Sequence, residues 1–141
     1  MTVYLDASFL AGLFIRTDAF ASRATAFSKR GGEPMVVSDF ATAEFSSVIA
    51  RLTRMNNIQE PEARDVFRDF DAWRYLFAEA EDAISTDIRA ATAIIRRLDL
   101  NIRAPDAINL AIAMRLGASI ATFDHGMAQN AQTLGITVAT V

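Results

Sequence analysis

The segment "IRAPDAINLAIAMRLGASIATFD", residues 102–124, contains the signals for a helix and then for a strand. Residues 105–117 carry the helix pattern, with Pro105 near the first position and Gly117 just after the end. Residues 119–124 form a short apolar run that is typical of a buried strand. This order, a helix followed closely by a buried strand, favours an α/β fold.

The same alternation of elements runs along the whole chain. Further helices are expected from about residue 8 and over 18–30, 40–55, 59–77, 86–98 and 126–135. Further strands are expected at 2–5, 34–37 and 136–141, with a weaker strand signal at 80–84. Short apolar strands between helices predict a mainly parallel sheet, covered on both faces. No linker or repeat interrupts the pattern, so we predict one three-layer α/β/α domain over residues 1–141.

Composition limits the kinds of site that the chain can hold. It has 141 residues, 52% of them hydrophobic and 22% charged, which is a globular composition. It contains no cysteine and one histidine, His125, so thiolate zinc sites, multi-histidine metal sites and triads that need a second histidine are excluded. A metal bound here needs oxygen ligands, which favours Mg²⁺ or Mn²⁺.

Charge and hydropathy bear on partners and location. The net charge of −3 argues against a generally basic surface for nucleic acid, although the basic residues are almost all arginine, a good partner for phosphate. The N-terminal segment has no basic region before its apolar stretch, and no apolar run has the length of a membrane span. We therefore expect a cytoplasmic protein without membrane contact.

Four acidic residues, far apart in sequence, are predicted to meet at one edge of the sheet. Asp6 and Asp124 each end an expected strand, whereas Glu44 and Asp106 lie near the starts of expected helices. In a parallel α/β sheet the carboxyl ends of the strands and the N-termini of the following helices share one edge, where ligands bind. Clustered carboxylates repel one another, and a divalent cation removes most of that repulsion. The pattern therefore predicts a Mg²⁺ site suited to phosphate chemistry.

Each of these acids also has an ordinary structural explanation. Asp6 is compatible with a turn at a strand end, and Asp124 with the cap of the next helix. Asp106 fits a first-turn carboxylate that is favoured by the helix dipole. Glu44 lies in an apolar context and needs a partner or an ion if it is buried. Only their joint placement at one edge favours the metal site.

The sequence resembles PIN-domain ribonucleases of the VapC type, the toxins of bacterial toxin–antitoxin pairs. The resemblance covers nearly the whole chain and rests on "VYLDASFL" (3–10), "SDFATAEFSSVIAR" (38–51), the segment 102–124 and "GITV" (135–138). It implies that Asp6, Glu44, Asp106 and Asp124 are the catalytic, metal-binding set. It also implies supporting roles for Ser8 and for Thr122.

The resemblance further implies Mg²⁺-dependent (or Mn²⁺-dependent) cleavage of RNA, a homodimer, and inhibition by a cognate antitoxin. A helical stripe made of Phe67, Phe70, Trp73 and Phe77 fits either an antitoxin groove or ordinary core packing. Many relatives have a further acidic or amide residue shortly after the position of Asp124, whereas this chain reads "HGMAQNA" (125–131). Asn130 is therefore only a remote candidate for a fifth ligand. Asn109, one helical turn after Asp106, is a candidate for a supporting or substrate contact.

Two other functions fit parts of the pattern. In a phosphoryl-accepting α/β domain a strand-end Asp is phosphorylated, usually beside a lysine; the sole lysine, Lys29, ends an early helix and is badly placed for that role. A non-catalytic domain that binds a partner protein through its acidic edge or its aromatic stripe also remains open.

Overall fold

The computed structural model describes all 141 residues and contains one parallel sheet of four strands, in the order β3-β2-β1-β4. The strands are β1 (Val3–Leu5), β2 (Met35–Ser38), β3 (Ala78–Glu81) and β4 (Ser119–Ala121). Tyr4 of β1 is in register with Val36 on one side and with Ile120 on the other. The expected parallel α/β sheet is confirmed, and all carboxyl ends of its strands lie at one edge.

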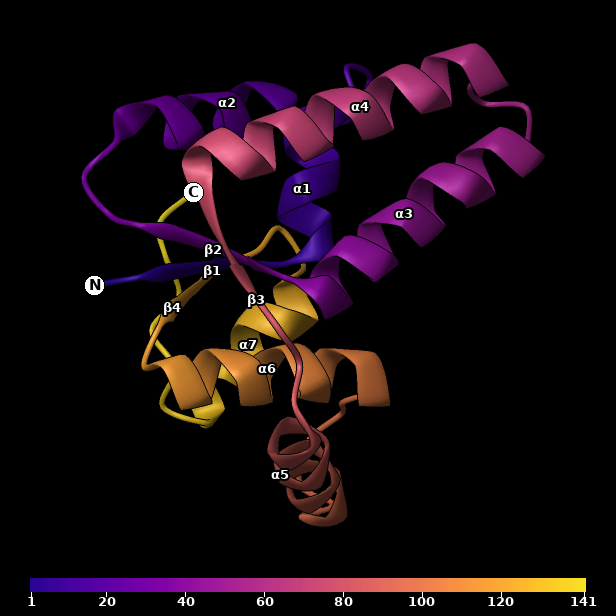
Figure 1. The fold of residues 1–141 in the computed structure, drawn as a ribbon. Coiled ribbons are helices and arrows are strands. Elements are labelled where there is room, and N and C mark those ends of the chain that lie inside the picture. Colours follow the sequence, from indigo (N-terminus) through magenta and orange to yellow (C-terminus); the bar gives the residue numbers. More distant parts are fainter.

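Seven helices surround the sheet in two layers (Figure 1). They are α1 (Ala7–Phe14), α2 (Ala21–Arg30), α3 (Asp39–Arg54), α4 (Glu60–Phe77), α5 (Ser85–Arg96), α6 (Ala104–Leu116) and α7 (His125–Thr133). In the view of Figure 1, α1, α2 and α4 lie above the strands, and α5, α6 and α7 lie below them. The three-layer α/β/α arrangement is therefore confirmed. None of the helices has the length and apolar character needed to cross a bilayer.

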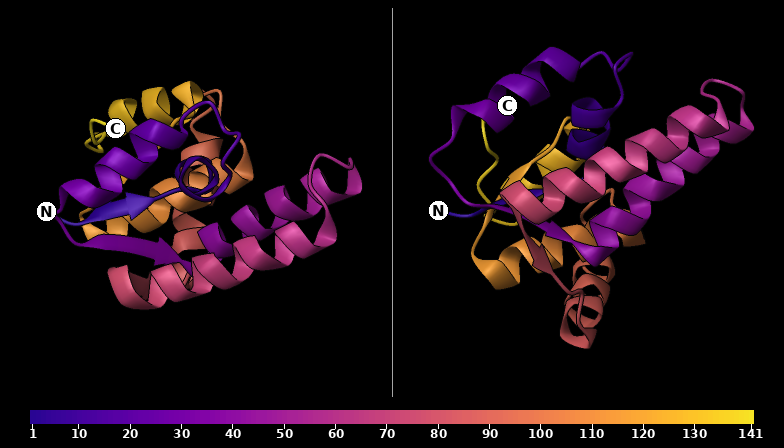
Figure 2. Two further views of the ribbon diagram at one scale, coloured as in Figure 1. Left: turned by 90° about the horizontal axis from the view of Figure 1, so that it is seen from above. Right: turned by 45° about the horizontal axis from the view of Figure 1, so that its top comes forward.

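Helices α3 and α4 form a long antiparallel pair that extends beyond the sheet (Figure 2). Phe70 of α4 is buried against Phe45 of α3 and Phe14 of α1, with ring centroids 4.9 and 5.5 Å apart. In the aromatic stripe of α4, Phe70 is thus core, Phe67 and Trp73 are partly buried against it, and Phe77 is 60% exposed. Core packing accounts for most of the stripe.

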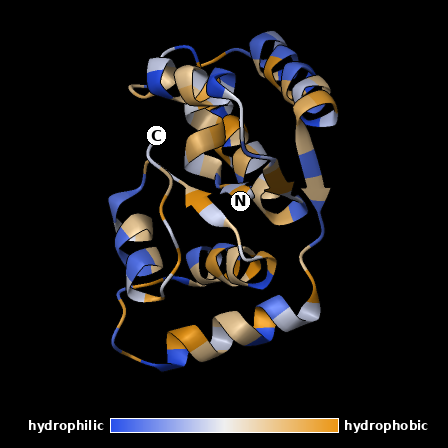
Figure 3. Ribbon diagram, turned by 90° about the vertical axis from the view of Figure 1, so that its left-hand side faces the viewer, coloured by the Kyte–Doolittle hydropathy of each residue, from blue (hydrophilic) through white to orange (hydrophobic).

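The central layer is apolar because helices cover both of its faces. Strands β1 and β4 are buried at every residue, whereas the edge strand β3, with the sequence AEAE, is partly exposed. Figure 3 shows the mixed polar and apolar colouring of the surrounding helices. Helix α6 is buried over most of its surface because it lies between the sheet and α5. It begins with Pro105 in its first turn and ends at Gly117, whose φ of 60° is left-handed.

The chain after α7 differs from the expectation of a strand over 136–141. Only Val138 makes a bridge, with Ile120 of β4. Two backbone hydrogen bonds hold this contact, from Ile120 N to Thr137 O and from Ala139 N to Ile120 O. Beyond it, the backbone oxygens of Thr140 and Val141 accept hydrogen bonds from arginines of α2 instead of from β4. The prediction of a final strand was therefore wrong beyond one bridge.

Candidate functional site

The four predicted acids all lie at the carboxyl edge of the sheet. Asp6 follows β1 directly and Asp124 follows β4, while Glu44 and Asp106 lie in the early turns of α3 and α6. The charge of Asp124 raises the pKa of both Asp6 and Asp106, and the charges of Asp106 and Asp6 raise that of Glu44. The structure therefore brings the four carboxyl groups into one electrostatic neighbourhood.

Asp6 is the most deeply buried member, with 4% of its surface exposed. Its Oδ1 accepts hydrogen bonds from the backbone N of Phe9 (2.9 Å) and from Ser8 Oγ (2.7 Å), and its Oδ2 accepts one from Thr122 Oγ1. Burial raises the pKa of Asp6, and these hydrogen bonds offset part of the rise. Because each carboxylate oxygen has two lone pairs, only Oδ2 still has a lone pair for another ligand.

Ser8 and Thr122 both donate a hydrogen bond to Asp6, and their supporting role at a metal site stays a prediction. Besides binding Asp6, each hydroxyl accepts a hydrogen bond from the backbone that leads to Asp124. Ser8 Oγ accepts from Phe123 N (3.0 Å), and Thr122 Oγ1 accepts from Asp124 N (3.1 Å). The two hydroxyl groups thus connect the end of β1 to the start of α7 and fix the backbone between them.

Asp124 and Asp106 are the more open members of the set. Asp124 is exposed and caps α7, since its Oδ1 accepts from Met127 N (2.8 Å). The capping interpretation and the edge placement therefore both hold. Asp106 is half-buried; burial and the charge of Asp124 raise its pKa, Arg103 lowers it, and no hydrogen bond offsets the rise. Both residues keep at least one carboxylate oxygen free of protein partners.

Glu44 is held by a directed chain of buried hydrogen bonds. The Tyr4 hydroxyl donates to Asn109 Oδ1 (2.6 Å), so it accepts the proton of Ser38 Oγ (2.6 Å). Asn109 Nδ2 in turn donates to Glu44 Oε1 (2.6 Å) and to Pro105 O (3.0 Å). Burial raises the pKa of Glu44, and the bond from Asn109 offsets part of that rise. The amide orientation of Asn109 is thereby fixed, with its NH₂ group toward Glu44.

Asn109 is placed to support Glu44. It is 1% exposed, and its amide binds Tyr4, Glu44 and Pro105. Because this side chain is buried, the structure lends no support to the alternative of a direct substrate contact.

We expect the Tyr4→Phe variant to be less stable than the wild type by about 1–3 kcal/mol. The substitution leaves Asn109 Oδ1 buried without its donor and Ser38 Oγ without its acceptor. Tyr75, the other tyrosine, is 88% exposed, so Tyr75→Phe is the matched control and is expected to change stability by less than about 0.5 kcal/mol. Denaturant unfolding measures both variants, and equal effects would contradict a structural role for the Tyr4 hydroxyl.

The donor set fits Mg²⁺ in its chemistry. All candidate ligands are carboxylate oxygens, and free lone pairs remain on Asp6, Glu44, Asp106 and Asp124. No three Asp, Glu or His side chains in the structure lie close enough to share one metal ion directly. Magnesium in proteins is commonly held by one or two carboxylates together with waters, so it does not require three direct protein ligands. The assignment of the four acids as metal ligands stays a prediction.

His125 and Asn130 lie differently with respect to this edge. His125 is exposed and is the first residue of α7, next to Asp124. Asn130 is buried and donates through Nδ2 to Asn101 O (3.0 Å), so it holds the loop before α6. This hydrogen bond uses only Nδ2, and a role of Asn130 as a fifth ligand gains no support from it.

Sequence analysis missed Tyr4 as a member of this network. The segment "TVYL" (2–5) was interpreted as an apolar strand, and the tyrosine was counted as one of its apolar residues. A buried phenol nearly always needs a hydrogen-bond partner, so a tyrosine within a fully buried strand is a usable signal for a polar network below it.

Comparison with known proteins places this architecture in a family. The chain matches the PIN domain family over residues 3–132. No protein of curated function matches the sequence. Among solved structures it is similar to VapC20 of Mycobacterium tuberculosis, described as a sarcin-ricin loop cleaving toxin, with a TM-score of 0.76, 18% identity, and 99% of each chain covered.

Two further solved structures are also similar in fold. VapBC2 of Rickettsia felis, bound to a DNA fragment from its promoter, has a TM-score of 0.71 at 12% identity and covers 99% of this chain and 98% of its own. FitAcB of Neisseria gonorrhoeae has a TM-score of 0.71 at 16% identity, with 98% and 96% covered. The family match spans nearly the whole chain and agrees with the parallel sheet and its acidic edge. The chain belongs to the PIN-domain family.

Proposed function

We propose that this protein is a nuclease toxin of the VapC type, a Mg²⁺-dependent endoribonuclease that hydrolyses phosphodiester bonds at Asp6, Glu44, Asp106 and Asp124. Membership of the PIN family supports a nuclease, and the similarity to VapC20 supports RNA as the substrate class. The observation that carries the proposal is the convergence of four carboxyl groups, each from a different element, at the strand-end edge.

The surroundings of the four residues suit them to different roles. Asp6, fixed by three hydrogen bonds, provides a rigid anchor for an ion through the free lone pair of Oδ2. Asp106 and Asp124 provide oxygens without protein partners. When bound, Mg²⁺ would polarise the phosphodiester and supply positive charge to the transition state. Mn²⁺ offers the same oxygen-based chemistry.

Glu44 is suited to receive a proton from the attacking water. Burial and the charges of Asp106 and Asp6 raise its pKa, so the carboxylate is a stronger base than an exposed glutamate. Asn109 engages Oε1 and leaves Oε2 free for this role. The hydrogen-bond chain from Ser38 and Tyr4 holds the glutamate in position.

The partners are part of the same proposal. A toxin–antitoxin complex from Klebsiella pneumoniae has a similar fold, with a TM-score of 0.65 at 14% identity, which supports a cognate antitoxin for this chain as well. We also propose a homodimer, as the family resemblance implies. The phosphoryl-acceptor alternative gains no support, because Lys29, in the last turn of α2, lines a surface hollow with Leu13 and Arg16 and not with Asp6.

Removal of the divalent ion is expected to abolish RNA cleavage, and added Mg²⁺ or Mn²⁺ is expected to restore it. The test uses purified protein with total RNA, with and without a chelator, and maps the ends of the products. We expect 5′-phosphate and 3′-hydroxyl ends. Cleavage that is equally fast in excess chelator would overturn the metal requirement, and no cleavage of any RNA with either ion would overturn the ribonuclease assignment.

A further inference from the structure

A hollow of about 280 Å³ opens directly beside Asp124, between the acidic edge and α2. Its lining includes Phe20, Arg23, Phe123, Asp124, His125 and Val141. Phe20 and Arg23 belong to the start of α2, while Asp124 belongs to the acidic edge. The lining of the hollow thus includes both Asp124 of the candidate active site and the cationic Arg23.

Arg23 forms no salt bridge with an Asp or Glu side chain, and its one hydrogen bond is to Val141, the last residue of the sequence. Its guanidinium carbon lies 5.5 Å from the ring centroid of Phe20 and 5.3 Å from that of Phe123, and Nη2 donates to the backbone oxygen of Val141. Contact with two rings and one backbone oxygen fixes the orientation of the planar guanidinium group before any ligand binds. An arginine has five N–H donors, so most of them remain available to a ligand.

The aromatic rings that support Arg23 are themselves anchored in the core. Phe20 stacks on Phe123, with centroids 4.5 Å apart and planes at 4°, and Phe123 stacks on the buried Phe9 at 5.6 Å. Gly12 makes this possible, because a Cβ at that position would lie 3.0 Å from the Phe123 ring. Phe123 lies between Thr122 and Asp124 in the sequence, so the stack connects Arg23 rigidly to both of these residues.

We propose that this hollow is a binding subsite for the phosphate of the RNA nucleotide next to the cleaved bond, with Arg23 as its ligand. The proposal rests on the proposed ribonuclease function. An acidic edge on a chain of net charge −3 repels RNA, so binding requires cations placed beside the carboxylates. Arg23 is placed in this way next to Asp124, and a preformed guanidinium fork matches the geometry of a phosphate.

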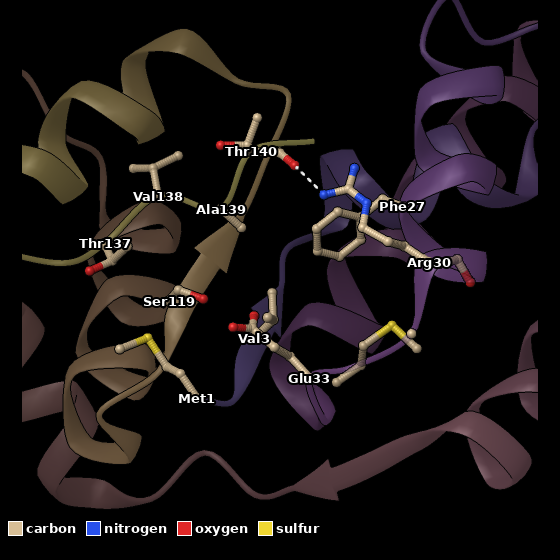
Figure 4. Close-up of a pocket in the computed structure, with 13 residues that line it drawn as sticks. Met1, Val3, Phe27, Arg30, Glu33, Ser119, Thr137, Val138, Ala139 and Thr140 are labelled. Atoms are coloured by element: carbon tan, nitrogen blue, oxygen red, sulfur yellow. Dashed lines mark hydrogen bonds between the residues drawn. The ribbon is translucent and has the colours of Figure 1, made fainter.

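The chain offers a closely matched control in Arg30, about two turns further along the same face of α2. Its guanidinium carbon lies 5.3 Å from the ring centroid of Phe27, and Nη1 donates to the backbone oxygen of Thr140 at 3.5 Å. Figure 4 shows Arg30 reaching Thr140 across a different hollow, which is lined by Val3 and Ser119 at the starts of β1 and β4. Arg30 thus makes contacts of the same kind as Arg23, with an aromatic ring and a backbone oxygen, but lies at the opposite edge of the sheet.

The test compares Arg23→Gln, Arg23→Lys and Arg30→Gln, first for cleavage and then for binding. The probe is a fluorescent RNA that copies a site cut by the wild type, and binding is measured by anisotropy in an Asp106→Asn background. We expect Arg23→Gln to weaken binding about tenfold. We also expect it to reduce the slope of log affinity against log salt by about 0.7, the value for one phosphate contact on a single strand. Arg30→Gln should change neither quantity.

The outcomes separate this subsite from the function on which it rests. Equal affinity and salt slope for Arg23→Gln and Arg30→Gln would overturn the subsite while the ribonuclease stands. If the wild type cuts no RNA, the proposed function fails first. If Arg23→Gln has a lower melting temperature than Arg30→Gln, the Arg23→Lys variant decides, because lysine keeps the positive charge but lacks the planar guanidinium group. We expect Arg23→Lys to bind RNA more weakly than the wild type with an unchanged salt slope. Wild-type affinity of Arg23→Lys would overturn the proposal.

Discussion

The Asp106→Asn variant is expected to lose RNA cleavage by a factor of about 10² or more while it keeps its fold. Asp106 is half-buried in the first turn of α6, beside Asp124, and its carboxylate has no hydrogen bond to lose. An amide of the same shape removes the negative charge that an ion requires but leaves the packing of α6 unchanged. Initial cleavage rates at saturating Mg²⁺ measure the effect.

The same substitution is expected to raise the melting temperature of the metal-free protein. Burial and the charge of Asp124 raise the folded-state pKa of Asp106 above its ordinary value of 3.8, so its ionisation opposes folding at neutral pH. In the metal-free wild type, ionisation of Asp106 does not affect the free energy of unfolding below pH 3.8. It lowers that free energy as the pH rises from 3.8 through the raised folded-state pKa, and the loss is complete above that pKa. Asp106→Asn removes this dependence.

Two comparisons make the result specific to Asp106. Asp71 is an exposed acid on α4 without an ion pair, and Asp71→Asn should change neither cleavage nor melting. Asp6→Asn should also abolish cleavage, but it should not stabilise the protein, because its amide NH₂ cannot accept the hydrogen bonds that the carboxylate accepts from Ser8, Phe9 and Thr122 on both of its oxygens. Full cleavage by Asp106→Asn would remove that residue from the proposed site.

The Arg115→Met variant is expected to lower the free energy of unfolding by about 3 kcal/mol. Arg115 of α6 binds both oxygens of Asp87, at 2.8 and 3.0 Å, and also Glu81 at 2.8 Å. The Asp87 side chain is only 2% exposed, and its hydrogen bonds with Arg115 hold its pKa below the ordinary value against the effect of burial. Methionine fills the volume but leaves a buried carboxylate unpaired, which is the costly outcome.

The pair formed by Arg97 and Asp99 is the control for this prediction. It is also bidentate, at 3.1 and 2.7 Å, but its side chains are 43% and 51% exposed. Arg97→Met should therefore cost no more than about 1 kcal/mol. Because the pKa of Asp87 is depressed, the contribution of its pair is present above the ordinary pKa of 3.8 and is lost as the pH falls through the lower folded-state value. Urea unfolding of both variants at neutral and at acid pH tests the difference.

Much of the fold follows from local sequence signals, and the failures have local physical causes. The helix that contains Asp106 could be predicted because proline and glycine mark its ends. The third strand was expected at 80–84 but lies at Ala78–Glu81, since an exposed edge strand with the sequence AEAE carries no apolar run. The alternation after Gly135 favoured a strand, whereas arginines of α2 take the backbone oxygens of Thr140 and Val141.

The site divides in the same way. Its four acids could be predicted because strand ends and helix starts share an edge in any parallel α/β sheet. The Tyr4–Asn109–Glu44 chain could not be predicted, because it depends on how closely β1, α3 and α6 approach one another. Arg23 lies on an ordinary helix face in the sequence, and only the position of the segment after α7 brings its hollow next to Asp124.

The hydrogen-bond chain through Tyr4 has a consequence for how the molecule loses activity. It starts at Ser38, the cap of α3, crosses β1 and α6, and returns to α3 at Glu44, so it closes a ring through three elements of the core. Separation of α6 from α3 would remove the hydrogen bond from Asn109 to Glu44, and separation of β1 would remove the bond from Tyr4 that orients Asn109. We therefore expect the position of Glu44 to depend on the packing of the core and not on a surface loop.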